Sequence, residues 1–360
     1  MPKVSVIMPS YNVASYIEEC LKSVIDQTLR DIEIICIDAG STDGTIDIIE
    51  KYSSIDDRIR IIHSNKKSYG YQVNVGINTS QGEYIGLVET DDFVDPTMYE
   101  KLYLFAKENQ ADVVKGPYIE YYNNKVKQVC YYADLLNRTL PNKCFSAKEY
   151  GLILSYHASV WSGLYKKSYI RENNIFLIEA ESASYVDVNF RIQTCINTTK
   201  IAWYKEPLYF YRVNNVNSST NNFNLSSMLE RWKEVHRFFN EYKADYEDYY
   251  GKYLILDEYL NTLAYLDFSD ISKDELEMMI ENYSSVNKKI IISSPVINRK
   301  IKERILSFKE NPYLYYKKVN KHVSTKKKIK RLLNFIIPKG TKMRIILKKV
   351  ILLKNANPVT

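Results

Sequence analysis

The sequence lacks several features that would by themselves indicate a class of protein. No apolar run reaches the roughly 20 residues that a membrane-spanning helix needs, and the first residues do not form a signal-peptide pattern. The cysteines are odd in number and show no paired metal-ligand spacing; they are Cys20, Cys36, Cys130, Cys144 and Cys195. These absences favour a reduced, cytosolic compartment over a disulfide-bonded secreted protein.

Acidic residues are missing from the end of the chain. Residues 311–360 hold 14 Lys and Arg but no Asp or Glu, which leaves 36 basic and 43 acidic residues in 1–310. The net charge of +7 therefore combines a mildly acidic body with a strongly basic tail. Such a tail predicts an anionic partner, which is either a lipid surface or a nucleic acid.

Short apolar runs alternate with helical patterns through the first hundred residues. We expect strands at 4–8, 32–37, 59–63 and 84–88, and helices at 13–28, 45–52, 70–80 and 97–108. Strands and helices that alternate with short connections predict an α/β fold with a parallel, doubly wound sheet and right-handed crossovers.

Beyond residue 108 the alternation loosens. We expect strands at 111–122 and 126–132, a helix beginning at Ser146, a mixed segment at 158–170, a helix at 185–197 and a strand pair at 200–213. The Asn- and Ser-rich stretch 214–227 is predicted to be a loop or a linker, and 228–310 has a helical pattern. The expected parts are an α/β domain over 1–222, a helical region over 223–320 and a basic tail over 321–360.

Paired carboxylates follow the fourth expected strand. The apolar run at 84–88 leads directly into Glu89-Thr90-Asp91-Asp92. In an open α/β sheet, ligands bind at the carboxyl ends of the strands. Hard carboxylate oxygens there suit Mg²⁺ or Mn²⁺, and these ions in turn suit a diphosphate. Helix capping remains the alternative on these residues alone, because Asp92 or Asp95 before Pro96 is able to start a helix.

Five short strings of the amino-terminal part form a series. They are Val-Ser-Val-Ile-Met-Pro-Ser-Tyr-Asn at 4–12, Ile-Asp-Ala-Gly-Ser-Thr-Asp-Gly-Thr at 37–45, Gly-Glu-Tyr-Ile…Asp-Asp at 82–92, Trp-Ser-Gly-Leu-Tyr at 161–165 and Val-Asp-Val-Asn-Phe at 186–190. In this order and spacing they resemble family 2 inverting glycosyltransferases of the GT-A fold. The resemblance covers about residues 3–215, and the stretch 69–74 is similar to bacterial capsule or surface-polysaccharide members.

The resemblance implies a nucleoside-diphosphate sugar as donor, most often a UDP-sugar. Pro9 and Tyr11 match positions beside the nucleobase and ribose. Asp38 matches the carboxylate that accepts a hydrogen bond from the uracil ring, a charge-assisted contact; a strand-end turn residue is the alternative. The second Asp of that motif is Ala39 here. Asn74 is placed with the donor-binding residues.

The carboxylates at 89–92 match the Asp-x-Asp region of the family. The resemblance implies that Asp92 is the direct ligand of Mn²⁺ or Mg²⁺ and that Asp91 contacts sugar or ribose hydroxyls. Glu89 stands where the family has Asp, and its longer side chain remains a candidate for the ribose. A bound cation would neutralise the departing diphosphate, which is the electrostatic requirement for breaking a glycosyl–phosphate bond.

Asp187 matches the catalytic base of the family. Its expected task is to accept the proton of an acceptor hydroxyl as that oxygen attacks the sugar, which inverts the anomeric configuration. The alternative is an acidic residue that stabilises a helix N-terminus. Glu179 and Glu181 are fallback bases. Trp161 is a candidate for stacking on an acceptor sugar, and a core tryptophan is equally compatible with the sequence.

The basic tail contains two amphipathic patterns, 326–337 and 342–354, separated by Pro338-Lys339-Gly340. Basic amphipathic helices lie on anionic lipid, so the tail predicts peripheral attachment at the inner face of the cell membrane, where a glycan or lipid-linked glycan acceptor is reached. Packing against the acidic body or a second subunit is the alternative. Nucleic acid ranks last, because the body lacks a recognition module.

A second function of a different class stays open. The departures at Ala39 and Glu89 are compatible with a catalytically silent subunit that binds sugar nucleotides or acts as a scaffold in a polysaccharide assembly complex. Asp91, Asp92 and Asp187 argue for the enzyme. The oligomeric state, the sugar and the linkage are not predicted.

Overall fold

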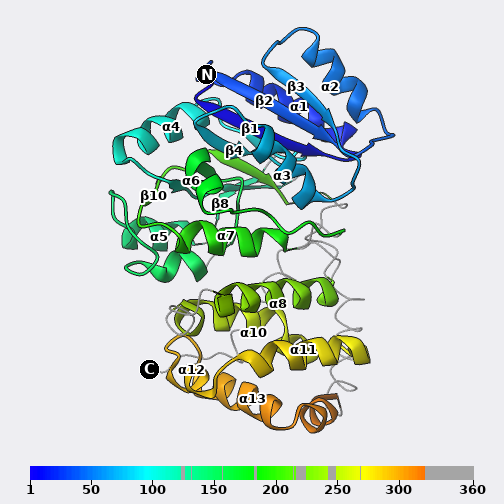
Figure 1. Ribbon diagram of the computed structural model, residues 1–360, viewed down its shortest axis with the longest axis vertical. Helices are drawn as coiled ribbons and strands as arrows, with labels where there is room; N and C mark the ends of the chain where they lie inside the picture. The colour runs from blue at the N-terminus through cyan, green and yellow to red at the C-terminus, as the bar shows by residue number, and fades with distance from the viewer. Residues whose placement is uncertain are drawn as a thin grey trace. The chain divides into compact units, whose positions relative to one another are not determined.

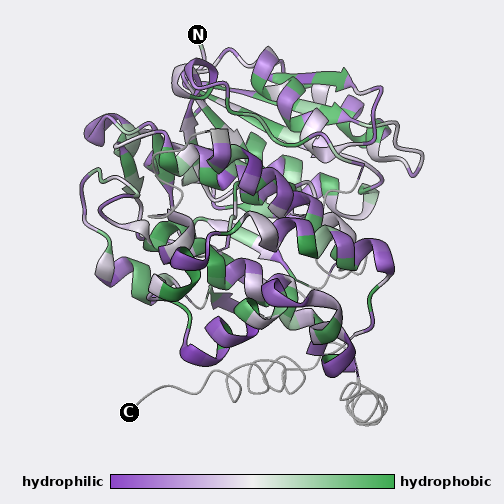
Figure 2. Cartoon of the chain, turned by 60° about the horizontal axis from the view of Figure 1, so that its bottom comes forward, coloured by the Kyte–Doolittle hydropathy of each residue, from purple (hydrophilic) through white to green (hydrophobic). Residues whose placement is uncertain are grey.

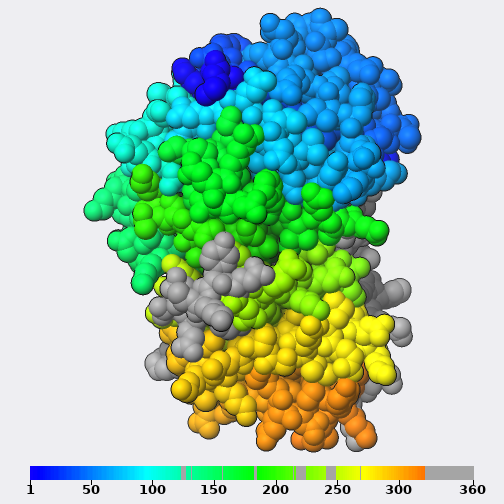
Figure 3. Space-filling model, in the orientation of Figure 1, coloured from blue at the N-terminus to red at the C-terminus, as the bar shows by residue number. Residues whose placement is uncertain are grey.

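The computed structural model describes residues 1–122, 126–130, 132–155, 157–181, 185–213, 215, 224–241, 249–267 and 269–320. The chain divides into two compact units, Met1–Phe223 and Asn224–Thr360, which Figures 1 and 3 colour from blue to green and from yellow-green to orange. The tail expected at 321–360 lies outside the described residues. Each unit is described by itself.

The amino-terminal unit is built on a seven-stranded sheet. Its strands are β1 (Val4–Ser10), β2 (Ile32–Asp38), β3 (Ile59–His63), β4 (Tyr84–Leu87), β6 (Val113–Lys115), β9 (Gly163–Lys166) and β10 (Ile201–Trp203). Their order is β10-β6-β9-β4-β1-β2-β3. β1 pairs in parallel with β2 and β4, and only β9 runs antiparallel to its neighbours β4 and β6. The predicted mostly parallel, doubly wound sheet is confirmed.

Helices connect these strands and cover both faces of the sheet (Figure 1). They are α1 (Ala14–Ile25), α2 (Thr45–Ser53), α3 (Tyr69–Thr79), α4 (Met98–Asn109), α5 (Ala133–Thr139), α6 (Lys167–Glu172) and α7 (Val186–Ile196), with a 3₁₀ helix at Gly151–Ser155.

Two glycines let helices approach the sheet closely. A Cβ on Gly76 of α3 would lie 2.5 Å from the side chain of Ile7, and a Cβ on Gly86 of β4 would lie 2.5 Å from Tyr99 of α4. In the parallel pairing of β1 with β4, Gly86 is level with Val6 and therefore faces the opposite side from Ile7. α3 and α4 thus cover opposite faces, which makes β1 and β4 central and buried.

A smaller, four-stranded sheet adjoins the end of β4. Its strands are β5 (Phe93–Val94), β7 (Ile119–Tyr122), β8 (Val126–Val129) and β11 (Tyr209–Arg212), in the order β5-β11-β7-β8. The prediction of a strand pair at 200–213 is wrong. Two strands form there, but β10 belongs to the first sheet and β11 to the second, so they do not pair with each other. The helix expected from Ser146 is also wrong. There Ser146 and Glu149 exchange hydrogen bonds that close a turn, and a 3₁₀ helix follows only at Gly151.

The second unit is helical, as the pattern at 228–310 predicts. It contains α8 (Leu225–Glu241), a π-helical turn at Tyr250–Leu254, α10 (Ile255–Asn261), a 3₁₀ helix at Leu263–Asp267, α11 (Lys273–Ser285), α12 (Lys288–Ser293) and α13 (Arg299–Glu310). The helices of the structure carry both hydrophobic and hydrophilic residues (Figure 2). Within the described residues, no helix combines the length and hydropathy that crossing a membrane requires.

Candidate active site

A cavity of about 590 Å³ opens at the carboxyl ends of β1 and β4. Seven of the candidate site residues from the sequence line it, namely Pro9, Tyr11, Glu89, Asp91, Trp161, Asp187 and the fallback base Glu181. Asp38, Asn74 and Asp92 were also expected at the site but are not among its lining residues. The cavity therefore joins segments that are nearly 180 positions apart in the chain, as the crossover topology of the sheet allows.

The turn after β4 aims one of the two adjacent Asp side chains into the cavity. The Asp92 amide donates to the Glu89 carbonyl at 3.0 Å, and the Thr90 hydroxyl donates to the Pro9 carbonyl at 2.8 Å. This fixes the turn against β1. Asp91 projects into the cavity, where its Oδ2 accepts a hydrogen bond of 2.7 Å from the side-chain amide of Asn215.

Asp92 points the other way and is buried, with 1% of its surface exposed. Its Oδ1 accepts from the Arg212 backbone amide at 2.7 Å, and its Oδ2 accepts from the Tyr209 hydroxyl at 2.9 Å. Burial raises the pKa of Asp92 well above its ordinary value, and the charge of Asp91 adds to that rise. Both oxygens thus join the turn to β11, so the geometry argues against the metal-ligand role predicted for Asp92.

Glu89 lies on the floor of the cavity. Its Oε1 accepts a hydrogen bond of 2.5 Å from the hydroxyl of Tyr69, the first residue of α3. Burial raises the pKa of Glu89 to about 8; the Tyr69 bond opposes this rise, whereas the charges of Asp91 and Asp187 add to it. Three carboxyl groups from two distant segments therefore share one electrostatic environment.

Asp187 reaches the cavity from the first turn of α7. Tyr185 precedes this helix in a left-handed conformation, with φ of 63°, and Val186 anchors the first turn in the core. Asp187 itself is half-buried on the cavity wall. His157 lines the same cavity, and its Nδ1 accepts from the Ser159 amide at 3.0 Å. The local sequence does not identify His157 as a site residue, because only the fold places it in the same cavity as Asp187.

The rim next to β1 is formed by aromatic and basic side chains. Lys67 donates to the Tyr11 hydroxyl at 2.8 Å and lies 4.6 Å from the centre of its ring. Ala39 lines the cavity, whereas the Asp38 carboxylate is turned into its own loop. There it accepts from the backbone amides of Gly40 and Ser41, each at 2.9 Å. Asp38 therefore fits the turn alternative better than the predicted uracil contact.

Asn74 supports the cavity from behind. Its side-chain amide donates to the Leu177 carbonyl and its oxygen accepts from the Leu177 amide, both at 2.9 Å. It holds the segment that leads to Glu179 and Glu181, of which only Glu181 lines the cavity. The structure therefore gives Asn74 a positioning contact in place of the predicted donor contact.

Trp161 forms one wall, but its ring is stacked. The ring centres of Tyr209 and Tyr211 lie 4.2 Å and 5.3 Å away, at interplanar angles of 24° and 7°. Only 4% of Trp161 is exposed, so the core alternative accounts for most of its surface.

The carboxylate oxygens at the floor of the cavity fit a hard divalent cation as ligands. Glu89 and Asp91 offer carboxylate oxygens two positions apart, which is the ligand type that Mg²⁺ and Mn²⁺ prefer. Within the described ranges, no group of three or more acidic, His or Cys side chains meets in a metal-binding arrangement. A cation held here by two protein carboxylates would have coordination positions left for phosphate oxygens.

Part of the chain matches a family model, and its sequence is similar to curated glycosyltransferases. Residues 5–157 match the family model described as Glycosyl transferase family 2. The chain is 32% identical over 217 residues to the uncharacterized glycosyltransferase EpsJ of Bacillus subtilis, which covers 59% of this chain and 62% of EpsJ. It is 30% identical over 220 residues to the poly(ribitol-phosphate) beta-glucosyltransferase of Bacillus spizizenii, covering 59% of this chain and 32% of that protein.

A solved structure is similar over most of the chain. The crystal structure of Staphylococcus aureus TarS 1-349 in complex with UDP-GlcNAc superposes with a TM-score of 0.74 at 18% identity. The match covers 90% of this chain and 92% of that one, which shows that the two share a fold. In sequence, the chain spans less than two thirds of the length of the first curated relatives that it matches.

Proposed function

We propose that the chain, whose residues 5–157 match the model of Glycosyl transferase family 2 and which shares a fold with TarS, transfers a sugar from a nucleoside-diphosphate sugar to a hydroxyl of a surface polysaccharide. The observation that carries this proposal is that Glu89, Asp91 and Asp187 line one and the same cavity at the carboxyl edge of the sheet. Carboxylates from both sides of one cleft suit a reaction that needs a cation on one side and a base on the other.

The donor is proposed to lie between the rim and the floor of the cavity. Pro9 and Tyr11 would contact the nucleobase and ribose, and the Lys67 ammonium beside Tyr11 would offset phosphate charge. A UDP-sugar is the proposed donor, since the similar TarS structure is a complex with UDP-GlcNAc. Asp38 drops out of this set because one of its oxygens accepts from the backbone amides of its own turn and the other accepts from the Ser41 hydroxyl.

Asp91 replaces Asp92 in our proposal as the carboxylate that holds Mn²⁺ or Mg²⁺, with Glu89 beside it. When bound, the cation would supply positive charge against the diphosphate as it leaves. The Asn215 side chain donates a hydrogen bond to one oxygen of Asp91, which would leave the other oxygen for the cation. Glu89 carries a hydrogen bond from Tyr69, which limits its rotation in the same way.

Asp187 is the proposed general base. It would accept the proton of the acceptor hydroxyl while that oxygen forms a bond to the anomeric carbon and the bond from that carbon to the phosphate oxygen breaks. One such displacement inverts the anomeric centre. The placement of Asp187 in the first turn of α7, anchored by buried Val186, would hold the carboxylate still during the transfer.

The acceptor is proposed to be a glycan or a lipid-linked glycan of the cell surface. The relative that acts on poly(ribitol phosphate) supports an acceptor of this kind. We propose that the reaction takes place at the cytoplasmic face of the membrane, with the basic tail at 321–360 attached to anionic lipid. The tail lies outside the described residues, so this attachment stays a prediction from the sequence.

A donor screen tests the proposal. Each nucleotide sugar is added with Mn²⁺ and the melting temperature is followed, since a ligand at 100 times its Kd adds about 2.7 kcal/mol to the free energy of unfolding. The ligand that stabilises the chain is then tested for transfer and for release of nucleoside diphosphate. Stabilisation by one UDP-sugar together with its turnover supports the enzyme. Stabilisation without any turnover favours the catalytically silent subunit, and no stabilisation by any nucleotide contradicts both.

A further inference from the structure

The segment that forms α12 and most of α13 in the helical unit is strongly basic. Residues 288–309 contain seven Lys or Arg and a single acidic residue, Glu303. Arg304 is held by both oxygens of Asp267, at 2.7 and 2.8 Å, and Arg299 pairs with Glu303 at 2.8 Å. The other five cations are the lysines at positions 288, 289, 300, 302 and 309. Among the residues that the structure describes, no carboxylate forms an ion pair with these five.

Contacts between α12 and α13 bring several of these lysines together. Lys302 of α13 donates to the Ile292 carbonyl at 2.6 Å, near the end of α12. Lys309, two turns further along α13, donates to the carbonyls of Tyr283 and Ser284, just before α12 begins. Burial lowers the pKa of Lys309, and the positive charge of Lys288 lowers it further. α13 therefore runs alongside α12 and places its lysines at both ends of that short helix.

α12 itself has one buried side and one exposed side. Ile290 and Ile291 are buried, with 2% and 0% of their surfaces exposed. Ile292 is 60% exposed, and the exposed residues Lys288 and Lys289 precede it by four and three positions, on the same side of the helix. Ile292 is thus a solvent-exposed apolar side chain surrounded by lysines. We call Lys288, Lys289, Ile292 and Lys302 the basic face.

We propose that the basic face binds an anionic lipid surface, with Ile292 entering the boundary between headgroups and acyl chains. Like charges gathered on one face repel each other unless an anionic partner lies opposite, and a bilayer with anionic headgroups supplies that charge over a wide area. The exposed Ile292 separates this partner from a nucleic acid, whose phosphates would meet the lysines but offer the isoleucine no hydrocarbon. The face is distinct from the tail, and its binding requires neither a donor nor turnover.

A tryptophan placed on the basic face tests the proposal in the full chain. The native tryptophans Trp161, Trp203 and Trp232 are all buried, so the variant Ile292→Trp adds one exposed reporter. With vesicles of phosphatidylcholine and phosphatidylglycerol, we expect the added emission to shift to shorter wavelength; with phosphatidylcholine alone we expect no shift. Ile55→Trp is the matched control, since Ile55 is 75% exposed and belongs to the amino-terminal unit, and its emission should stay unchanged on the same vesicles.

Charge reversal supplies a second, independent measurement in case the tryptophan variant does not fold. Lys288→Glu with Lys289→Glu should weaken co-sedimentation of the full chain with anionic vesicles by more than about fivefold for each charge lost. The control Lys143→Glu with Lys148→Glu changes the same charge at two exposed lysines of the other unit and should bind like the wild type.

Several results would overturn the proposal. The first two are failure of the chain to bind anionic vesicles, and an unchanged emission of Ile292→Trp on vesicles that the chain does bind. The third is an equal loss of vesicle affinity in both charge-reversal pairs. The fourth is an equal emission shift with soluble inorganic polyphosphate, which would indicate a site for polyanions. None of these readouts involves sugar transfer, so failure here leaves the proposed activity standing, and the reverse also holds.

Discussion

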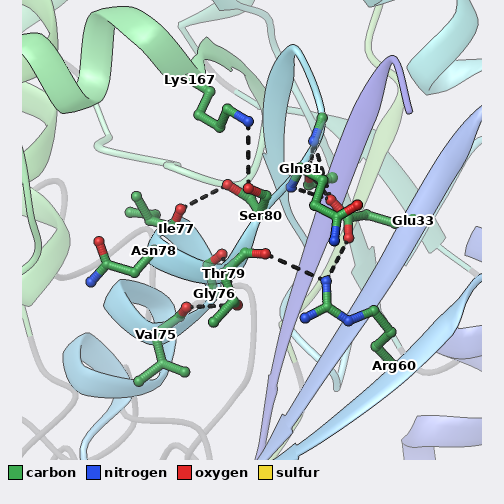
Figure 4. Close-up of polar contacts among 12 residues, drawn as sticks. Glu33, Arg60, Val75, Gly76, Ile77, Asn78, Thr79, Ser80, Gln81 and Lys167 are labelled. Atoms are coloured by element: carbon green, nitrogen blue, oxygen red, sulfur yellow. Dashed lines mark hydrogen bonds and ion pairs between the residues drawn. The ribbon is translucent and has the colours of Figure 1, made fainter. Parts of the chain in front are cut away.

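The two edges of the central sheet hold carboxylates in opposite circumstances. At the amino-terminal edge, the Glu33 carboxylate of β2 accepts from the Ser5 hydroxyl and from the backbone amide of Gln81, each at 2.5 Å. It also accepts from the Arg60 guanidinium at 2.9 Å (Figure 4). It also accepts from the Gly82 amide at 3.1 Å, and a Cβ on Gly82 would lie 2.5 Å from the Ser5 nitrogen. The fold itself supplies every partner of this carboxylate.

At the carboxyl edge, the carboxylates have few partners among the residues that the structure describes. Glu89 receives one side-chain hydrogen bond from Tyr69, Asp91 receives one from Asn215, and both face an open cavity with Asp187. Negative charge gathered in a cleft destabilises the empty protein and attracts a cation or a proton donor. A buried acid whose partners all come from the fold is therefore a structural element, whereas an acid with few partners beside a cavity is a candidate for function.

The largest expected effect is at the base. Asp187→Asn removes the proton acceptor but keeps the shape of the side chain, so kcat should fall by about 10²- to 10⁴-fold. The melting temperature and the affinity for the donor should stay close to those of the wild type. Steady-state transfer assays and thermal scans measure the two quantities side by side.

Glu181→Gln is the matched control, because Glu181 lines the same cavity and is exposed. It should keep most of the activity. If Glu181→Gln loses as much activity as Asp187→Asn, or if Asp187→Asn turns over normally, residue 187 is not the base.

The opposite edge should respond in stability. Glu33→Ala leaves two backbone amides and Arg60 without their acceptor, so the free energy of unfolding should fall by about 2–4 kcal/mol. The activity of the folded fraction should not change. Chemical denaturation provides the measurement, and Glu83→Ala provides the control. The Glu83 carboxylate pairs with Lys107 at 2.8 Å and accepts from the Tyr103 hydroxyl at 3.0 Å, and its loss should cost no more than about 1.5 kcal/mol. Equal losses at the two positions would show that the partners of Glu33 stabilise the fold no more than a half-exposed ion pair does.

The smallest expected effect is a change in pH dependence. The pKa of Glu89 is about 8 in the folded chain against an ordinary 4.5, so the native state keeps a proton that the unfolded chain has lost between these values. This group therefore makes stability fall as the pH rises through that window, and the fall ends above about pH 8. Glu89→Gln cannot ionise, so its melting temperature, measured with a chelator present, should decline less from about pH 6 to about pH 8.5. An unchanged decline would show that Glu89 ionises normally.

Much of the amino-terminal fold could be predicted from periodicity, because each strand and helix of the first hundred residues has its own local pattern. The assignment of strands to sheets could not. β9 enters the first sheet between β4 and β6, and β10 and β11 separate into different sheets, through pairings between residues far apart in the chain.

The site was foreseen in part, for a related reason. The resemblance identified the carboxylates, but adjacent Asp91 and Asp92 differ only in which way each side chain points. That direction is set by the Tyr209 hydroxyl and the Arg212 amide, 117 and 120 positions away from Asp92. The role of Asp38 in a turn could be predicted from the sequence, because Asp-x-Gly-Ser is a local turn signal. In the structure, the Asp38 carboxylate accepts from backbone amides of that turn. His157 has no local signal of function.

Titration of UDP into the protein by calorimetry, with Mn²⁺ or with a chelator, tests most directly whether the open edge of the sheet is the ligand site. We predict that Mn²⁺ strengthens binding to the wild type, and that Asp91→Asn loses about tenfold or more of that affinity with Mn²⁺ but little with the chelator. Asp92→Asn should lower the melting temperature and keep the Mn²⁺ effect. The account would be contradicted if Asp91→Asn bound UDP like the wild type while Asp92→Asn lost its response to Mn²⁺.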